Sequence, residues 1–215
     1  CFNCKNLKQA FESKKRYFPL DKGGAYRKWY GNNEKVIKMD KTSYNELLML
    51  GNHLPSRELY FLKGLTWSKI TSGKFSIRYD DFGHVFSSVG LKGFPDNNSI
   101  NNVLGFMNSE VAEYYLEAIS PGMSTVSGDL EKLPYYINYQ EKENVNLIVE
   151  NSVQIAKYDW DYFEISWDFS AHPLVSLKSK GNSVINYSNA QYRIKDIYKD
   201  WEYQTGQDFI KLKAI

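Results

Sequence analysis

Cysteine and histidine, the residues that most often hold zinc, are scarce in this sequence of 215 residues. The two cysteines, Cys1 and Cys4, form a CxxC pair, which supplies half of a tetrahedral zinc site. No second cysteine pair follows, and the three histidines show no HxxxH spacing. Ordinary reduced cysteines are therefore favoured over a metal or redox role, and we expect no metal site in this chain.

The sequence also lacks the loops that hold phosphates, cofactors or a catalytic nucleophile. No two glycines lie two residues apart, which excludes the GxGxxG loop, and Gly73-Lys74-Phe75 departs from the GK[ST] of nucleotide-hydrolysing proteins. No serine stands in a GxSxG turn. The prolines are never adjacent, so the Asn/Asp-Pro-Pro-aromatic loop that holds a flipped adenine is missing. We expect no catalytic residue of these classes in the chain.

Two acidic patterns bear on nuclease or carboxylate chemistry. Pro95-Asp96 matches the first half of a metal-dependent nuclease motif, but no [DE]xK triplet follows it. Residues 159–168 contain four acids, and each of them stands beside an aromatic residue. This setting favours a packed structural segment over a pair of catalytic carboxylates.

Long hydrophobic runs are absent as well. No apolar run approaches the ~18–20 residues needed to cross a bilayer, and no signal-peptide pattern opens the chain. The sequence thus predicts a cytoplasmic protein with no membrane partner. Its first residue is Cys and not Met, which we interpret as the start of a piece from inside a longer protein.

Charge is distributed unevenly along the chain. Residues 1–92 hold 17 Lys and Arg against 8 Asp and Glu, whereas residues 93–215 hold 10 against 17. A basic half joined to an acidic half indicates a surface for a polyanion more than a pocket for a small molecule. Residues 23–33 strengthen this interpretation, because they place two cations and three aromatic rings among glycines that permit a close backbone approach. Cations balance phosphates, and rings can stack on bases.

The residues of this loop each have a second explanation. Arg27 and Lys28 could contact phosphate or guanine, or form a solvated surface pair. Trp29 could stack on a base, although anchoring the loop in the core is the favoured role. Asn32 and Asn33 could bind an adenine edge, but asparagine more often forms turns.

A second group of polar residues follows on two predicted strands. Ser68, Lys69, Ser72 and Lys74 suit phosphate contacts beside a hairpin, and an ordinary solvated sheet face is an equal alternative. Arg78 shares the predicted outward face with Lys74. The full set of candidate DNA-contacting residues is Lys22, Arg27, Lys28, Trp29, Tyr30, Asn32, Asn33, Ser68, Lys69, Ser72, Lys74 and Arg78.

The N-terminal half shows mainly strand patterns. Residues 5–18 predict a basic amphipathic helix that Pro19 ends, and residues 35–39 predict a strand. Short β-prone runs follow, with Phe75, Ile77 and Tyr79 alternating with polar neighbours on the third of them. Residues 80–83 predict a hairpin connection, and Leu47, Leu48 and Leu50 are expected to be buried. The four runs are residues 58–62, 65–70, 74–79 and 84–89.

The C-terminal half shows helical patterns. Helices are predicted from residue 101 or 102 to about 119, over 145–157, and from about Ser188 to the end. The first carries an apolar stripe of Leu104, Met107, Val111, Tyr115 and Ala118. The predicted fold is therefore α+β: a small twisted antiparallel sheet flanked by helices, with a C-terminal helical connector.

Several segments together resemble one family. Residues 26–32 and 66–76 (YRKWYGN and TWSKITSGKFS) are similar to the C-terminal part of PglX, the adenine-specific DNA methyltransferase of BREX phage-defence systems. The helix pattern LGFMNS at 104–109 and the aromatic, acidic stretch at 157–169 also resemble this family. Residues 128–134 (GDLEKLP) look like a strand shared with target-recognition domains of TaqI-like and type I restriction–modification proteins. The chain departs from the family pattern at 38–42 and 122–126, where recognition segments are expected to vary.

The resemblance implies a domain organisation. Residues 1–136 would form a target-recognition domain that binds double-stranded DNA, and residues 137–215 a helical connector with an aromatic and acidic tail. The S-adenosylmethionine site and the catalytic loop would lie upstream, outside this chain, which itself would bind no cofactor. The upstream methyltransferase domain and other defence-system subunits are the implied protein partners. The alternatives are a domain that docks other defence proteins without reading DNA and, less favoured, a nuclease fragment.

Overall fold

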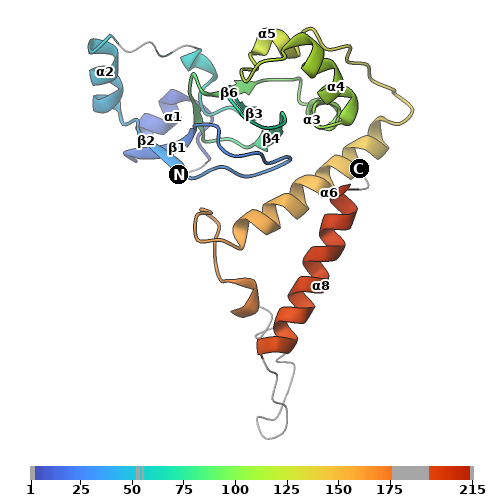
Figure 1. Ribbon diagram of the computed structural model, residues 1–215. Coiled ribbons are helices and arrows are strands. Elements are labelled where there is room, and N and C mark those ends of the chain that lie inside the picture. The colour runs from blue at the N-terminus through green and yellow to red at the C-terminus, as the bar shows by residue number, and fades with distance from the viewer. Residues whose placement is uncertain (1–2, 52–53, 55, 176–193, 214–215) are drawn as a thin grey trace, which may run out of the picture.

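The computed structural model describes residues 3–51, 54, 56–175 and 194–213, and it confirms an α+β fold (Figure 1). The strands form two sheets of three strands each, in place of the single antiparallel sheet expected from the sequence. Helices α3 to α6 lie on one side of the sheets, and α2 stands apart at the margin (Figure 1). No helix in the described part is long and apolar enough to cross a membrane.

The first sheet has the strand order β2-β1-β5. β2 (Lys35–Lys38), which the sequence predicted, runs antiparallel to β1 (Tyr17–Asp21), whereas β5 (Val85–Phe86) runs parallel to it. The helix predicted over 5–18 is wrong in extent, because α1 covers only Leu7–Glu12 and Lys14 turns the chain at a φ of 56°. Pro19 then lies inside β1, opposite Val36. Phe18, Met39, Phe61 and Val85 form the core of this sheet.

The second sheet has the order β4-β3-β6, with both pairs antiparallel. β3 (Gly64–Ser68) and β4 (Ile77–Asp80) form a hairpin, and β6 (Gly90–Gly93) lies on the other side of β3. Two predictions fail here. Residues 58–62 contain a short 3-10 helix, η1 (Arg57–Leu59), and no strand. Residues 80–83 do not close a hairpin, because β4 and β5 belong to different sheets.

Three helical regions differ from the sequence pattern. The predicted helix 101–119 is two helices, α3 (Ile100–Met107) and α4 (Glu110–Ile119), because Ser109 caps a new helix start. As a result Val111 and Tyr115 are exposed, although the stripe predicted them buried. Residues 127–130 form a helix, α5 (Ser127–Leu130), and no strand. α2 (Lys41–Met49) leaves Leu48 and Leu50 exposed.

Two long helices complete the chain. α6 (Lys142–Asp161) extends the predicted helix at both ends and packs on α3, where Gly105 allows Val149 to approach. α8 (Ile194–Lys213) meets α6 at the C-terminal end of the chain (Figure 1). Its predicted start near Ser188 lies outside the described residues. The main core joins the second sheet to these helices through Trp29, Leu65, Trp67, Leu104 and Val149.

Candidate nucleic-acid interface

The loop between β1 and β2 is held along the free edge of β4. The Trp29 amide donates to the carbonyl of Ile77 at 3.1 Å, and the Tyr79 amide donates to the carbonyl of Trp29 at 2.8 Å. Trp29 adopts a φ of 74°, and its side chain is 6% exposed within the main core. The ring therefore anchors the loop, which is the role that the sequence favoured.

Arg27 ties the same loop to α6. Its Nε donates to the carbonyl of Tyr30 at 2.9 Å, and one terminal nitrogen donates to the carbonyl of Ala156 at 3.3 Å. The same nitrogen pairs with Asp159, and the guanidinium lies 5.0 Å from the centre of the Trp160 ring. These contacts occupy the guanidinium within the chain.

The neighbours of Arg27 also bond inward. Lys28 Nζ donates to the carbonyl of Asn108 at 2.7 Å, and burial lowers the pKa of this lysine. The half-buried Tyr30 ring lies 5.0 Å from Lys157 Nζ. Asn32 has a φ of 63° and donates from its amide to the carbonyl of Ala25, so it forms a turn, and Asn33 is buried.

Five predicted residues are exposed or half-buried and lie around the end of the β3–β4 hairpin. The Ser68 hydroxyl links this end to the β1–β2 loop, because it accepts from the Gly24 amide at 2.9 Å and donates to the Gly24 carbonyl at 3.0 Å. Lys74 pairs with Glu113 at 2.5 Å, and the hydrogen bond to Glu113 raises the pKa of this lysine. We call this set the hairpin surface: Lys22, Ser68, Lys69, Ser72 and Lys74.

The strand pattern predicted the wrong location for Arg78. The alternation along 74–79 predicted it on an outward face, but its side chain is buried at 1% exposure. The β1–β2 loop covers the outer edge of β4, which would otherwise be solvated. The Arg27 carbonyl of this loop accepts a hydrogen bond from the Arg78 guanidinium at 3.4 Å. Burial lowers the pKa of Arg78 to about 10, against the opposing influence of Asp21 and Asp80.

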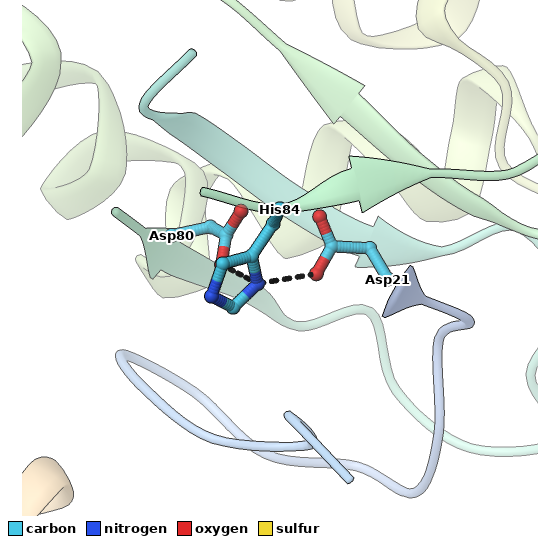
Figure 2. A group of neighbouring side chains, drawn as sticks. All are labelled: Asp21, Asp80 and His84. Atoms are coloured by element: carbon cyan, nitrogen blue, oxygen red, sulfur yellow. Dashed lines mark hydrogen bonds and ion pairs between the residues drawn. The ribbon is translucent and has the colours of Figure 1, made fainter. Parts of the chain in front are cut away.

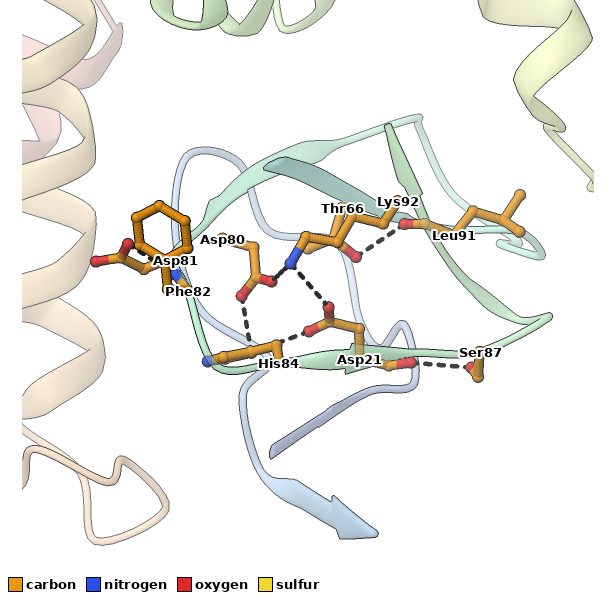
Figure 3. Close-up of polar contacts among 9 residues, drawn as sticks. All are labelled: Asp21, Thr66, Asp80, Asp81, Phe82, His84, Ser87, Leu91 and Lys92. Carbon is orange, nitrogen blue, oxygen red and sulfur yellow. Dashed lines mark hydrogen bonds and ion pairs between the residues drawn. The ribbon is translucent and has the colours of Figure 1, made fainter. Parts of the chain in front are cut away.

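The carboxylates near Arg78 belong to a buried charge cluster, which we define as Asp21, Arg78, Asp80, His84 and Lys92. His84 Nδ1 lies 2.8 Å from an Asp80 oxygen and 3.3 Å from an Asp21 oxygen, so the ring is placed between the two carboxylates (Figure 2). Lys92 Nζ pairs with Asp80 and lies 3.7 Å from Asp21 (Figure 3). The cluster joins Asp21 of the first sheet to Asp80 and Lys92 of the second.

Burial and neighbouring charges shift the pKa values of this cluster. Burial alone would lower the pKa of His84, but Asp80 and Asp21 together raise it to about 10. Burial would likewise raise the pKa of Asp80, and His84 with Lys92 outweighs it and holds that pKa below its usual range. The pKa of Asp21 is raised by burial and by Asp80.

Three of these side chains lie close enough to share a cation: Asp21, Asp80 and His84. The Lys92 ammonium already contacts both carboxylates, and a positively charged imidazole cannot ligate a metal ion. An incoming cation would have to displace the lysine and a proton. The arrangement therefore works as an ion-pair cluster.

Sequence reasoning named only Arg78 of this cluster, and for another role. Its members come from β1, β4, β6 and the segment before β5, and no local pattern joins them. The one available signal was the DxxxH spacing of Asp80 and His84, which is too common to indicate a site. Pro95-Asp96, by contrast, belongs to the turn before α3, where an Asp96 oxygen accepts from the amide of Asn98.

The acidic segment at the end of α6 and just after it is also tied to its own chain. Lys157 pairs with Asp161 at 2.8 Å and with Asp168 at 2.5 Å, and Asp161 accepts from the hydroxyl of Ser166. Asp159 pairs with Arg27. These acids hold the end of α6 against the β1–β2 loop and the following turn, as expected of a packed structural segment.

Comparison with known proteins finds relatives of one kind. No protein-family model matches the chain. It is 35% identical over 180 residues to "Adenine-specific methyltransferase BrxX" of Escherichia coli O9:H4 (strain HS), which covers 82% of this chain and 14% of that protein. It is 30% identical over 213 residues to "Adenine-specific methyltransferase PglX" of Lacticaseibacillus casei (strain Zhang), covering 94% of this chain and 17% of that protein. The chain thus spans less than a fifth of the length of these curated relatives.

Proposed function

Because the chain is related to a segment of PglX-like adenine-specific methyltransferases, we propose that it is a double-stranded DNA recognition module of such an enzyme in a phage-defence system. The similarity to the two named relatives is the observation that carries this proposal. The module binds the duplex and selects its sequence, and methyl transfer to an adenine N6 takes place in an upstream methyltransferase domain. S-adenosylmethionine binds in that domain.

The sequence of the chain supports this assignment. It contains no GxGxxG loop, no Asn/Asp-Pro-Pro-aromatic loop and no completed nuclease motif. The chain aligns with 14–17% of the length of the two methyltransferases, a share that a recognition or assembly module of a larger enzyme can occupy. A cytoplasmic location follows from this role.

The hairpin surface is the proposed contact with DNA. The strands β3 and β4 are largely buried, so the proposed contact is made by the connection between them, residues 69–76, where Ser72 and Lys74 are exposed. Lys22, Lys69 and Lys74 lie around this end of the hairpin and supply phosphate contacts, with Ser68 and Ser72 as hydroxyl donors. The predicted residues that point inward, above all Arg27, Trp29 and Arg78, serve DNA indirectly by holding the loop beside this hairpin.

A charge-removal experiment tests this surface. We compare the chain with Lys22→Ala/Lys69→Ala/Lys74→Ala for binding of a fluorescent 30-base-pair duplex in 100 mM salt. Each lost phosphate contact removes a salt-dependent increment of affinity, so the triple variant binds at least ~10-fold more weakly. The matched control is Lys195→Ala/Lys199→Ala, two exposed lysines of α8, which leaves affinity unchanged. An equal loss of duplex affinity in both variants would show that the hairpin surface is not the DNA interface.

Sequence selectivity needs a separate measurement. The chain is mixed with a library of duplexes that contain a random 12-base-pair centre, and the bound fraction is sequenced. A recognition module enriches one motif, because each wrong base pair costs ~1–3 kcal/mol. Because phosphate contacts carry no sequence information, the triple lysine variant is expected to bind more weakly and to enrich the same motif.

One observation favours a second candidate, a domain that docks other defence proteins. Three of the predicted cations are paired within the chain: Arg27 with Asp159, Lys28 with the Asn108 carbonyl, and Lys74 with Glu113. A docking domain shows weak DNA affinity that neither lysine variant changes. The same titration therefore separates the two candidates.

A further inference from the structure

The buried charge cluster lies directly beneath the start of the β1–β2 loop. Asp21 is the last residue of β1, and Lys22 of the hairpin surface follows it. The side chains of Asp21 and Asp80 are 2% and 0% exposed, and that of His84 is 10% exposed. The cluster thus lies in the interior, and a change in its contacts would act on the loop that begins after Asp21.

His84 bridges the two sheets through Asp21 and Asp80. These carboxylates come from different sheets, and the imidazole Nδ1 lies within 3.3 Å of an oxygen of each (Figure 2). β1 and β5 of the first sheet share only a two-residue register, and β5 follows His84 directly. The two sheets share no strand, so a buried bridge of this kind can fix their relative position.

Further contacts carry this position into the β1–β2 loop. The Ser87 hydroxyl donates to the Asp21 carbonyl at 2.9 Å (Figure 3). Gly90 fits so closely that a Cβ there would lie 2.5 Å from the Asp21 carbonyl oxygen and from the Gly23 nitrogen. Three residues beyond Asp21, Gly24 bonds to Ser68 at the end of β3. A shift of Asp21 would therefore move Lys22 relative to the β3–β4 hairpin.

We propose that His84 is a positioning residue whose imidazolium bridge between Asp21 and Asp80 locks the two sheets together and holds the Lys22 loop against the hairpin in the arrangement that binds DNA. The DNA-binding consequence rests on the proposed function, whereas the locking of the sheets does not. The charged groups that face His84 are Asp21 from β1, Arg78 and Asp80 from β4, and Lys92 from β6. Asp21 and Asp80 are the groups closest to His84 Nδ1, whereas Lys92 contacts these two carboxylates and not the ring.

The first test is an NMR titration of the wild-type chain without DNA. The ring resonances of His84 keep the positions of the charged form from pH 5 to at least pH 8.5. The Gly24 amide, which bonds to Ser68, shifts together with His84 when the ring finally loses its proton. A His84 that titrates near pH 6.5, or a Gly24 amide that ignores its titration, would overturn the proposal.

The second test uses three variants in the same conditions. His84→Gln keeps a polar side chain without the charge, and we expect it to shift the Gly24 amide and weaken duplex binding about fivefold to tenfold at pH 7.5. His172→Gln is the matched control and changes neither the Gly24 amide resonance nor the affinity for the duplex. Leu104→Ala destabilises the core elsewhere and leaves the Gly24 amide in place, which separates positioning from general loss of stability.

Each outcome decides one part. A moved Gly24 amide with reduced affinity in His84→Gln supports the whole proposal. A moved amide with unchanged affinity overturns the link to DNA. If the wild-type chain binds no duplex at all, the proposed function fails, and the titration of His84 with Gly24 alone decides whether the sheets are locked as proposed. Should His84→Gln not fold, the wild-type titration still gives that decision.

Discussion

The guanidinium of Arg27 makes four contacts within the chain: with Tyr30, Ala156, Asp159 and Trp160. A guanidinium in a glycine-rich loop suits DNA phosphate, and it equally suits two carbonyls, a carboxylate and an indole face. Residue type alone cannot choose between these uses. The choice is made by α6, which the chain reaches more than a hundred residues later.

Lys92 is the residue on which the buried cluster depends most. Its side chain is fully buried between Asp80 and Asp21, so Lys92→Met leaves a buried carboxylate without its partner. We expect the free energy of unfolding to fall by about 3–5 kcal/mol in denaturant titrations. Lys132→Met, which removes an exposed lysine 3.6 Å from Asp129, changes it by less than ~1 kcal/mol. Similar small losses in both variants would contradict the description of the cluster.

His84 makes stability depend on alkaline pH. Its pKa is raised from 6.5 to about 10 in the folded chain, so the folded state holds the proton more tightly than the unfolded state. By linkage the stabilisation is complete below pH 6.5 and is lost as the pH rises toward 10. Unfolding free energies measured from pH 6 to pH 9.5 decline in the wild type, and this decline is much smaller in His84→Gln. If the unfolding free energy of His84→Gln declined as much as that of the wild type, the pH dependence would not come from His84.

At the scale of elements, β4 has no strand neighbour on its outer edge among the described residues, and single residues bond to that edge. Trp29 bonds to Ile77 and Tyr79, and the Asn108 side chain accepts from the Ile77 amide at 3.2 Å and donates to the Ile77 carbonyl at 2.9 Å. Asn108 lies at the break between α3 and α4. The break therefore brings a side-chain amide to a buried strand edge.

Replacing this amide tests the role of the break. Asn108→Leu leaves the buried Ile77 amide without a partner, and we expect a loss of about 1–3 kcal/mol in the free energy of unfolding. Asn151→Leu, on the exposed face of α6, is the matched control and stays within ~0.5 kcal/mol of the wild type. If Asn108→Leu were as stable as the control, the Asn108 side chain at the helix break would not contribute to the free energy of unfolding.

The elements that the sequence predicted well are those with a local signal. β2 and the β3–β4 hairpin follow β-prone runs, and the core of α6 follows helical spacing over 145–157. The division into two sheets has no such signal, because it depends on β5, two residues long, pairing in parallel with β1. The α3–α4 break also escaped the pattern, since LGFMNSEVAEYY keeps helical spacing across it.

At the scale of the whole molecule, Gly31 controls the contact between the β1–β2 loop and α6. It has a φ of 119°, and a Cβ there would lie 2.6 Å from Arg27 Nε and 2.9 Å from a Trp160 ring carbon. Gly31→Ala therefore separates the loop from α6 and adds backbone strain, at a cost of about 1–3 kcal/mol. Faster hydrogen exchange in residues 26–33 and around 156–160 reports the separation. Gly122→Ala, which meets no atom within 4 Å, leaves the exchange unchanged.

The DNA contact stays a prediction, and the structure bears only on where its candidate residues lie. The excess of cations in residues 1–92 pointed to this half of the chain, and Lys22, Lys69 and Lys74 remain as its exposed or half-exposed cations near the hairpin. The inward turn of Arg78 and the buried bridge at His84 depend on contacts between segments far apart in the sequence. Such contacts leave no trace in local spacing.

Salt dependence of duplex binding tests the central claim most directly. The affinity of the 215-residue chain for a 30-base-pair duplex is measured from 50 to 300 mM salt. A module that neutralises ~4–6 phosphates shows log K falling against log salt with a slope of about −4 to −5, and the Lys22→Ala/Lys69→Ala/Lys74→Ala variant has a slope smaller in magnitude by about 2–3. A wild-type slope near zero, or no measurable binding at 50 mM salt, would contradict the assignment of this chain to DNA recognition.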